Sequence, residues 1–285
     1  MLGLGASLTS EDVLSEVNQF LSFDGTDDKA DSTLNEAART ILSGTDDDTD
    51  DMANDISISM WIKPTWDAGA GDLLNVVPFL YIGNSSDVHE SVRIFYSIET
   101  TAGSNKNQIG AESRSSASNT RSVEFANLGS NNSITTTGNT PSTVDDANMW
   151  DSGNPGNVNS DGFIHLFFSR AGNTSDWQIF WQGQALSTTS NDSGILSIAD
   201  EDYDIISVGR DPVFNHFGNF GIKHLAIYHR SMSIASDLYN SGVMADPREL
   251  ASTDYLSVYY PFNENGNDVV NGLNLTITGA TFTQV

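Results

Sequence analysis

Hydrophobic and polar residues alternate along many short segments of this chain, a pattern typical of strands that bury one face. The clearest is ISISMWIKP at 56–64, where the isoleucines and Met60 occupy every second position. Pro64 ends this segment, because it has no N–H donor for a sheet ladder. Similar patterning predicts strands at 19–24, 73–83, 91–100, 121–128, 163–170, 176–183, 205–210, 221–230, 255–262 and 274–282. The pattern therefore predicts about ten strands rich in β-branched and aromatic residues.

Two short segments have helical signals instead. Residues 233–242 place Ile234 and Leu238 four apart and end at Gly242, and 246–250 has Asp246 as a cap before Pro247. We expect both to be connectors against an edge of the strands. No long helix alternates with the strands, as parallel sheets require, so the pattern predicts an all-β, antiparallel, two-sheet sandwich.

The chain of 285 residues fits one large domain with elaborations. Residues 1–19 have an apolar, glycine-rich opening followed by a short helical pattern, and we interpret them as an N-terminal arm. The sandwich is predicted to span 20–285. Within it, residues 129–162 are almost all polar or glycine and form a long polar excursion, which is typical of a functional surface loop.

Charge and composition exclude several classes of function. The 38 acidic residues against 12 basic ones give a formal charge of -26, which argues against nucleic acid as a partner. The simplest explanation of the acidity is that the charge keeps the protein soluble in a salty medium. The chain has no cysteine and therefore no disulfide or thiolate metal site. We expect no Sec signal peptide and no membrane insertion, because no apolar run has the necessary length.

Several short motifs carry a family resemblance. FDGTDD at 23–28 is followed by the strand that contains Trp61, by FIHLFFSRAG from Phe163, by ISVGR at 206–210 and by a closing segment at 217–242. In this order they resemble the laminin G-like jelly-roll modules of the concanavalin A-like lectin/glucanase superfamily. The resemblance implies a concanavalin A-like jelly roll with one or two short helices.

The same resemblance implies a role in binding surfaces. The MLGLG opening joined to such a module resembles small virion proteins of marine tailed bacteriophages. From this we expect a non-enzymatic virion surface protein, either a capsid decoration or a fibre component, with a lectin-like sandwich that binds surface glycans. Residues 1–19 would contact other virion proteins or copies of the chain. The alternatives are an extracellular, free-standing carbohydrate-binding module and a glycan hydrolase or lyase on the same fold.

Aspartates mark two candidate calcium sites, since hard cations prefer oxygen ligands and modules of this family often supply them beside the first turn. The first set is Asp24, Asp27 and Asp28, and the second includes Asp47 and Asp50. The alternative is that both are solvated acidic loops.

Sugar binding needs an exposed ring with amide and carboxylate neighbours. Trp150 has such neighbours in Asn148 and Asp151, and Trp66 is a second candidate. The alternative is that Trp150 anchors its loop to the sandwich.

The signals for catalysis are weaker. Glycosidases use paired carboxylates, and the nearest pattern is the alternating series Asp200, Asp202 and Asp204, which lacks a glutamate and also fits a solvated turn. The five histidines show no zinc spacing, and His165 reads as a packed strand residue. We therefore predict no enzymatic activity.

Overall fold

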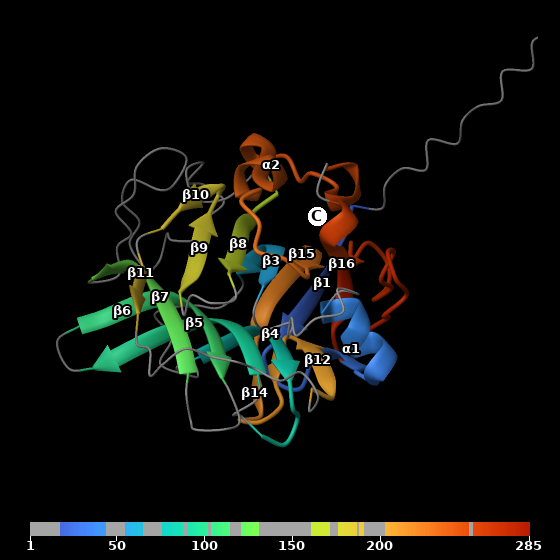
Figure 1. The fold of residues 1–285 in the computed structure, drawn as a ribbon. Helices are drawn as coiled ribbons and strands as arrows, with labels where there is room; N and C mark the ends of the chain where they lie inside the picture. The colour runs from blue at the N-terminus through green and yellow to red at the C-terminus, as the bar shows by residue number, and fades with distance from the viewer. Residues whose placement is uncertain are drawn as a thin grey trace, which may run out of the picture.

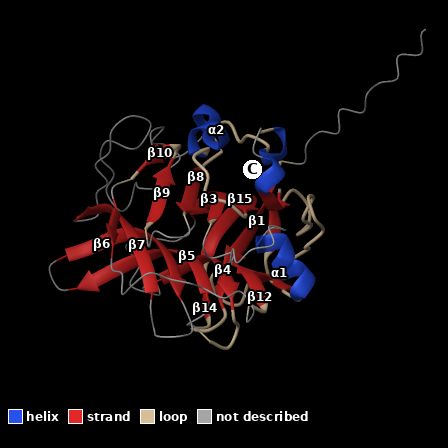
Figure 2. Ribbon diagram, viewed as in Figure 1, coloured by secondary structure: helices blue, strands red, loops and turns tan. Residues whose placement is uncertain are grey.

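The computed structural model describes residues 18–43, 55–64, 76–87, 91–101, 104–114, 121–130, 161–171, 176–186, 188–190, 203–250 and 253–285. In this part of the chain strands dominate, and the helices are short (Figure 2). The helical elements are α1 (Glu36–Ser43), α2 (Ala235–Tyr239) and the 3-10 turns η2 (Asn240–Gly242), η3 (Pro247–Glu249) and η4 (Thr253–Tyr255). No helix among the described residues is long and apolar enough to cross a membrane.

The strands form two sheets and a small hairpin (Figure 1). The first sheet runs in the order β10 (Gln184–Ala185), β9 (Trp177–Trp181), β8 (Ile164–Arg170), β3 (Ile56–Pro64), β15 (Asn219–Tyr228), β1 (Gln19–Asp24) and β18 (Thr281–Gln284), with β16 (Leu256–Tyr260) also paired to β15. The second sheet runs in the order β11 (Thr188–Ser190), β7 (Arg121–Ser130), β6 (Ser104–Arg114), β5 (Ser91–Thr101), β4 (Val76–Gly83), β12 (Ile205–Val208), β2 (Lys29–Thr33) and β17 (Thr276–Thr278). The hairpin joins β13 (Arg210–Asp211) to β14 (His216–Phe217).

The strand pairings of both sheets are antiparallel, for example β3 with β8 and β5 with β6. This confirms the predicted fold class, an antiparallel two-sheet jelly-roll sandwich. β1 begins at Gln19, the residue at which the arm was predicted to end, and the preceding residues 1–17 lie outside the described part.

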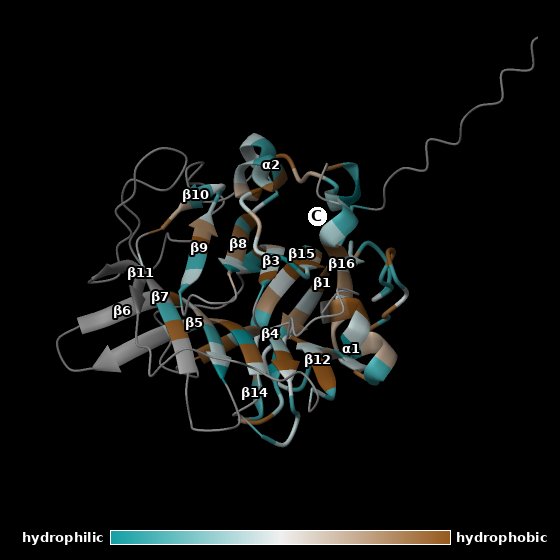
Figure 3. Cartoon of the chain, in the orientation of Figure 1, coloured by the Kyte–Doolittle hydropathy of each residue, from teal (hydrophilic) through white to brown (hydrophobic). Residues whose placement is uncertain are grey.

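The core lies between the sheets and follows the predicted alternation. Ile58 and Met60 of β3 and Leu21 of β1 point inward with no exposed surface, and Phe23 of β1 is 1% exposed. Along the strands, hydrophobic bands alternate with neutral and hydrophilic ones (Figure 3). Burial of this apolar surface is the main stabilising contribution to the fold.

The outer face of the first sheet is also covered. Trp61 points away from the main core but is only 1% exposed, because Phe20 and Phe163 pack beside it and Tyr239 stacks over it with ring centroids 6.1 Å apart. A second apolar group joins α2, through Leu238, to this face. The helix α2 therefore covers part of the first sheet, and Figure 1 shows it above β8 and β3.

Several elements were not predicted from the pattern, among them β2, β6, α1 and the short strands β10, β11 and β14. β2 and β6 consist mainly of polar residues, and α1 is a short helix between β2 and β3. β6 pairs along its whole length with β5, so backbone hydrogen bonds hold it, and among its described side chains Ile109 and Ala111 belong to the core. α1 begins after Asn35, whose side chain accepts a hydrogen bond from the Ala38 N–H at 2.9 Å, as an N-cap does.

Candidate functional site

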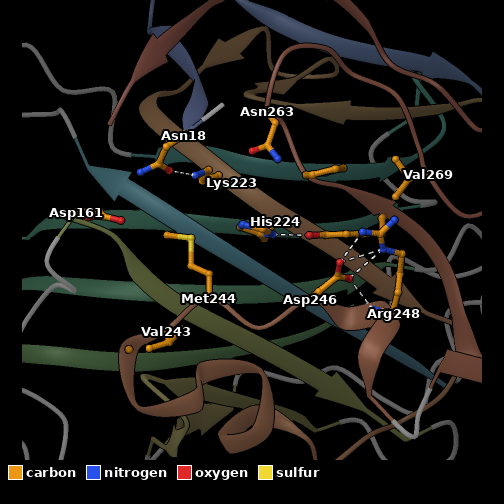
Figure 4. Close-up of a pocket in the computed structure, with 13 residues that line it drawn as sticks. Asn18, Asp161, Lys223, His224, Val243, Met244, Asp246, Arg248, Asn263 and Val269 are labelled. Atoms are coloured by element: carbon orange, nitrogen blue, oxygen red, sulfur yellow. Dashed lines mark hydrogen bonds and ion pairs between the residues drawn. The ribbon is translucent and has the colours of Figure 1, made fainter. Parts of the chain in front are cut away.

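A pocket lies at the outer face of the first sheet, lined in part by the segment after α2. Its volume is about 420 Å³, within the range of roughly 300–1,000 Å³ usual for small-molecule sites. Figure 4 shows its side chains, which come from segments far apart in the sequence. The lining residues are Asn18, Asp161, Lys223, His224, Gly242, Val243, Met244, Asp246, Arg248, Tyr259, Pro261, Asn263 and Val269. We call this the His224 pocket.

A β-bulge in β15 places two adjacent residues at the floor. The register of β15 against β3 shifts between Lys223 and Ala226. Ile222 and Leu225 consequently both face the core although they are three residues apart. Lys223 and His224 lie between them and both line the pocket, because a bulge interrupts the alternation of faces.

His224 adopts a left-handed backbone conformation with φ of 50°. A non-glycine residue in this region is strained and is frequent at functional sites. The ring of His224 stacks on that of Tyr259 at an interplanar angle of 19°, and its Nδ1 atom forms a hydrogen bond with the Tyr259 hydroxyl. Burial, together with the positive charge of Lys223, lowers the pKa of His224 to about 4. The imidazole is therefore neutral near pH 7.

Charged groups of both signs lie beside this histidine. Asp246 caps η3 and accepts hydrogen bonds from the backbone N–H and from Nε of Arg248, at 2.9 and 3.0 Å. Partial burial alone would raise the pKa of Asp246, but the Arg248 hydrogen bonds outweigh it, and the pKa is lowered. The Lys223 ammonium donates to Oδ1 of Asn18. The pocket thus offers cationic donors and anionic acceptors without a strong excess of either.

The connection from β16 to β17 forms one wall of the pocket and is held by a single carboxylate. Asp268 is 6% exposed and accepts hydrogen bonds from four backbone N–H groups, those of Tyr259, Val270, Asn271 and Leu273, at 2.9 to 3.0 Å. This arrangement fixes the part of the chain that carries Asn263 and Val269. A wall ordered in this way is a preorganised surface for a ligand.

The rim of the pocket is apolar. Val243 is 64% exposed and Val269 is 43% exposed, two of the few large hydrophobic side chains that reach solvent in the described part of the chain. Met244 lines the pocket between Val243 and Asp246 (Figure 4). Exposed apolar side chains around polar groups are typical of a binding surface.

The acidic cluster predicted at the first turn is present. One carboxylate oxygen from each of Asp24, Asp27 and Asp28 lies within 4.8 Å of the others. Asp28 is 6% exposed, and burial, with the nearby charges of Asp24 and Asp27, raises its pKa. A divalent cation bound by these oxygens would offset that repulsion, so the residues fit the chemistry of a calcium site. Bound calcium stays a prediction.

The other predicted binding residues lie outside the described part of the chain. These are the metal candidates Asp47 and Asp50 and the carbohydrate candidates Trp66, Asn148, Trp150 and Asp151. The prediction that they bind metal or sugar is unchanged.

Of the alternating aspartates, Asp204 is described, and it has a structural partner. Its two carboxylate oxygens accept hydrogen bonds from the backbone N–H and the hydroxyl of Ser85, at 2.7 and 2.8 Å. It therefore holds a loop beside β4. Asp200 and Asp202 lie outside the described residues.

His165 is a packed strand residue, as predicted. It has no exposed surface, and its Nε2 atom lies 2.9 Å from the Ser59 hydroxyl. Burial lowers its pKa to about 3. Since both partners of this serine–histidine pair are buried, they have no path to a substrate in the described structure.

Comparisons with known proteins agree with the fold. The chain resembles the heptameric SAP-like pentraxin of Limulus polyphemus with a TM-score of 0.53 and 9% identity, over 94% of this chain and 96% of the pentraxin. It also aligns with the CBM40 module of the Ruminococcus gnavus IT-sialidase, bound to α2,3-sialyllactose, with a TM-score of 0.45 and 14% identity over 80% and 99% of the two chains. No family model and no curated protein matches the sequence. At these identities the pentraxin likeness shows a shared fold alone.

Proposed function

We propose that this chain is a non-enzymatic, lectin-like carbohydrate-binding protein and that the sugar binds in the His224 pocket. The observation that carries the proposal is the composition of this pocket, in which charged and amide side chains surround a neutral histidine beneath an apolar rim. The lectin-like jelly roll supports it by analogy of fold.

The chemistry of a sugar matches such a lining. A pyranose presents hydroxyl groups along its edge, which both donate and accept hydrogen bonds, and C–H groups on its faces. Asp246 is an acceptor, Lys223 and Arg248 are donors, and charged partners make the stronger hydrogen bonds. Val243, Met244 and Val269 offer apolar contact to the C–H groups. Tyr259 is only 1% exposed, so its ring supports the floor and is not a stacking platform.

Glycan arrays probed with the labelled protein test this proposal. We expect binding that Asp246→Asn weakens at least about tenfold, since the variant loses the charged acceptor. The matched control is Asp237→Asn, which removes the same charge from an exposed position on α2 outside the pocket lining. Equal binding by both variants, or no binding to any glycan, would contradict the proposal.

Two further parts of the proposal concern activity and setting. We propose that bound glycans are not cleaved, and release of new reducing ends or unsaturated products from polysaccharides would overturn this. We also propose a virion surface setting, as a capsid decoration or fibre component, in which residues 1–19 contact other virion proteins or copies of the chain. A particle reconstruction that lacks this chain, or a monomer secreted by a cell, would favour the free-standing carbohydrate-binding module instead.

A further inference from the structure

We infer that the His224 pocket selects neutral sugars that carry an acetamido group, that is, N-acetylhexosamines. This inference rests on the carbohydrate-binding function proposed above. It starts from Asn263, whose Oδ1 atom is buried and has no hydrogen-bond partner in the described part of the chain. The side chain lines the pocket, where Figure 4 shows it near the wall that also carries Val269.

A buried acceptor without a partner is costly, and a ligand that supplies a donor recovers the lost hydrogen bond. The donor must reach an oxygen at the wall of a pocket whose rim is apolar. An acetamido group has an N–H donor, a carbonyl acceptor and a methyl group within one planar unit. A hydroxyl group offers the donor but not the methyl group.

The remaining parts of the acetamido group also find partners. Val269 is 43% exposed and lines the same pocket as Asn263, so the pocket offers an apolar surface to the methyl group. Lys223 and Arg248 are cationic donors in the same pocket for the carbonyl oxygen. Three chemically different contacts therefore match one substituent, and two of them come from the connection to which Asp268 is hydrogen-bonded.

Electrostatics favours a neutral sugar over an anionic one. The cations Lys223 and Arg248 already have Asn18 and the carboxylate of Asp246 as partners. An anionic sugar would place a second negative charge beside Asp246, within a chain whose formal charge is -26. Because like charges repel at close range, uronic and sialic acids are expected to bind more weakly than neutral N-acetylhexosamines.

The test compares monosaccharides by NMR titration of the whole chain: N-acetylglucosamine, N-acetylgalactosamine, glucose, fucose and glucuronic acid. We expect the two acetamido sugars to bind at least about tenfold more tightly than glucose, the factor that one well-formed hydrogen bond supplies. Fucose is the neutral competitor that has a methyl group without the amide.

Two variants of the same residue isolate the acceptor. Asn263→Asp keeps an acceptor oxygen and is expected to retain the preference for acetamido sugars, whereas Asn263→Leu is expected to abolish it. Asn267→Leu, at an exposed position of the same connection outside the pocket lining, is the matched control and should behave as the parent chain. Thermal unfolding of each variant verifies that it is folded.

The outcomes separate this inference from the function on which it rests. Equal affinity for glucose and the acetamido sugars, or tighter binding of fucose or glucuronic acid, overturns the inference and leaves carbohydrate binding in place. Retention of the preference by Asn263→Leu also overturns it. Failure of every glycan on the array to bind overturns the proposed function as well.

Discussion

Replacement of His165 should remove part of the acid sensitivity of this protein. The ring is fully buried between the side chains of Ser59, Trp61 and Tyr239, with centroids 5.1 Å from Trp61 and 6.2 Å from Tyr239. Burial lowers the pKa of His165 to about 3, whereas an unfolded histidine has a pKa of about 6.5. As the pH falls below about 6.5, the unfolded chain binds a proton that the folded chain does not, and the free energy of unfolding decreases.

The magnitude follows from the two pKa values. Between about pH 8 and pH 5.5, protonation of this one histidine in the unfolded chain raises the unfolding equilibrium constant by a factor of about 11. This lowers the free energy of unfolding by about 1.4 kcal/mol. The loss continues as the pH falls toward the folded pKa. Between about pH 8 and pH 5.5 the change in unfolding free energy depends little on the pKa of His165 in the folded chain, provided that this pKa stays below about 4.5.

Urea unfolding followed by tryptophan fluorescence measures the effect in the parent chain and in His165→Gln, which has no titrating group at this position. The difference in unfolding free energy between the two proteins should shrink by about 1.4 kcal/mol from pH 8 to pH 5.5, because the other titrating groups cancel in the comparison. A difference that stays constant with pH would refute the reasoning, since it would mean that His165 is protonated equally in the folded and unfolded chains.

Three further results are expected. Asp268→Ala leaves four backbone donors without their acceptor and should lower the unfolding free energy by about 3 kcal/mol or more, measured by urea unfolding. Arg93→Ala removes the cation that lies between the buried carboxylates of Glu112 and Asp211 and, although Glu112 keeps its ion pair with Arg114, should cost about 3 kcal/mol; a loss below about 1 kcal/mol would show that water reaches these carboxylates. Calcium at about a hundredfold above its Kd should stabilise the chain by about 2.7 kcal/mol, and Asp28→Asn should abolish that gain, whereas a melting temperature unaffected by calcium contradicts the metal site.

The strands with strong alternation were predictable from the sequence. The isoleucines of β3 and the pair Leu21 and Phe23 of β1 face the core as the period of two requires. The turn after β1 was predictable as well, since Gly25, with φ of 82°, follows the last strand residue. These features depend on neighbours in sequence, for which the pattern of side chains is direct evidence.

Elements held by distant partners were not predictable in this way. β6 owes its place to pairing with β5 and β7, and its polar residues give no alternation to detect. α1 did carry a signal, because Asn35 caps a segment in which Ala38 and Leu42 are buried four residues apart. That signal was missed because the helix is short and lies among acidic residues.

The acidic cluster was predicted because its three aspartates are close in sequence. The His224 pocket was not, because its residues come from before β1, from β15, from the segment after α2 and from the β16–β17 connection. The bulge that brings both Lys223 and His224 to the pocket adds one residue to the strand, whereas a strict period of two places such neighbours on opposite faces. One local signal was available, namely Asp246 before Pro247, which marks the capped turn that presents Arg248.

The central claim is that a sugar occupies the His224 pocket, and methyl NMR during a glycan titration tests it most directly. With methyl-labelled valine and methionine, the signals of Val243, Met244 and Val269 should shift together along one binding curve, while those of the core residues Val92 and Val208 stay in place. Shifts confined to residues outside the pocket, or none with any glycan that the protein binds, would contradict the claim.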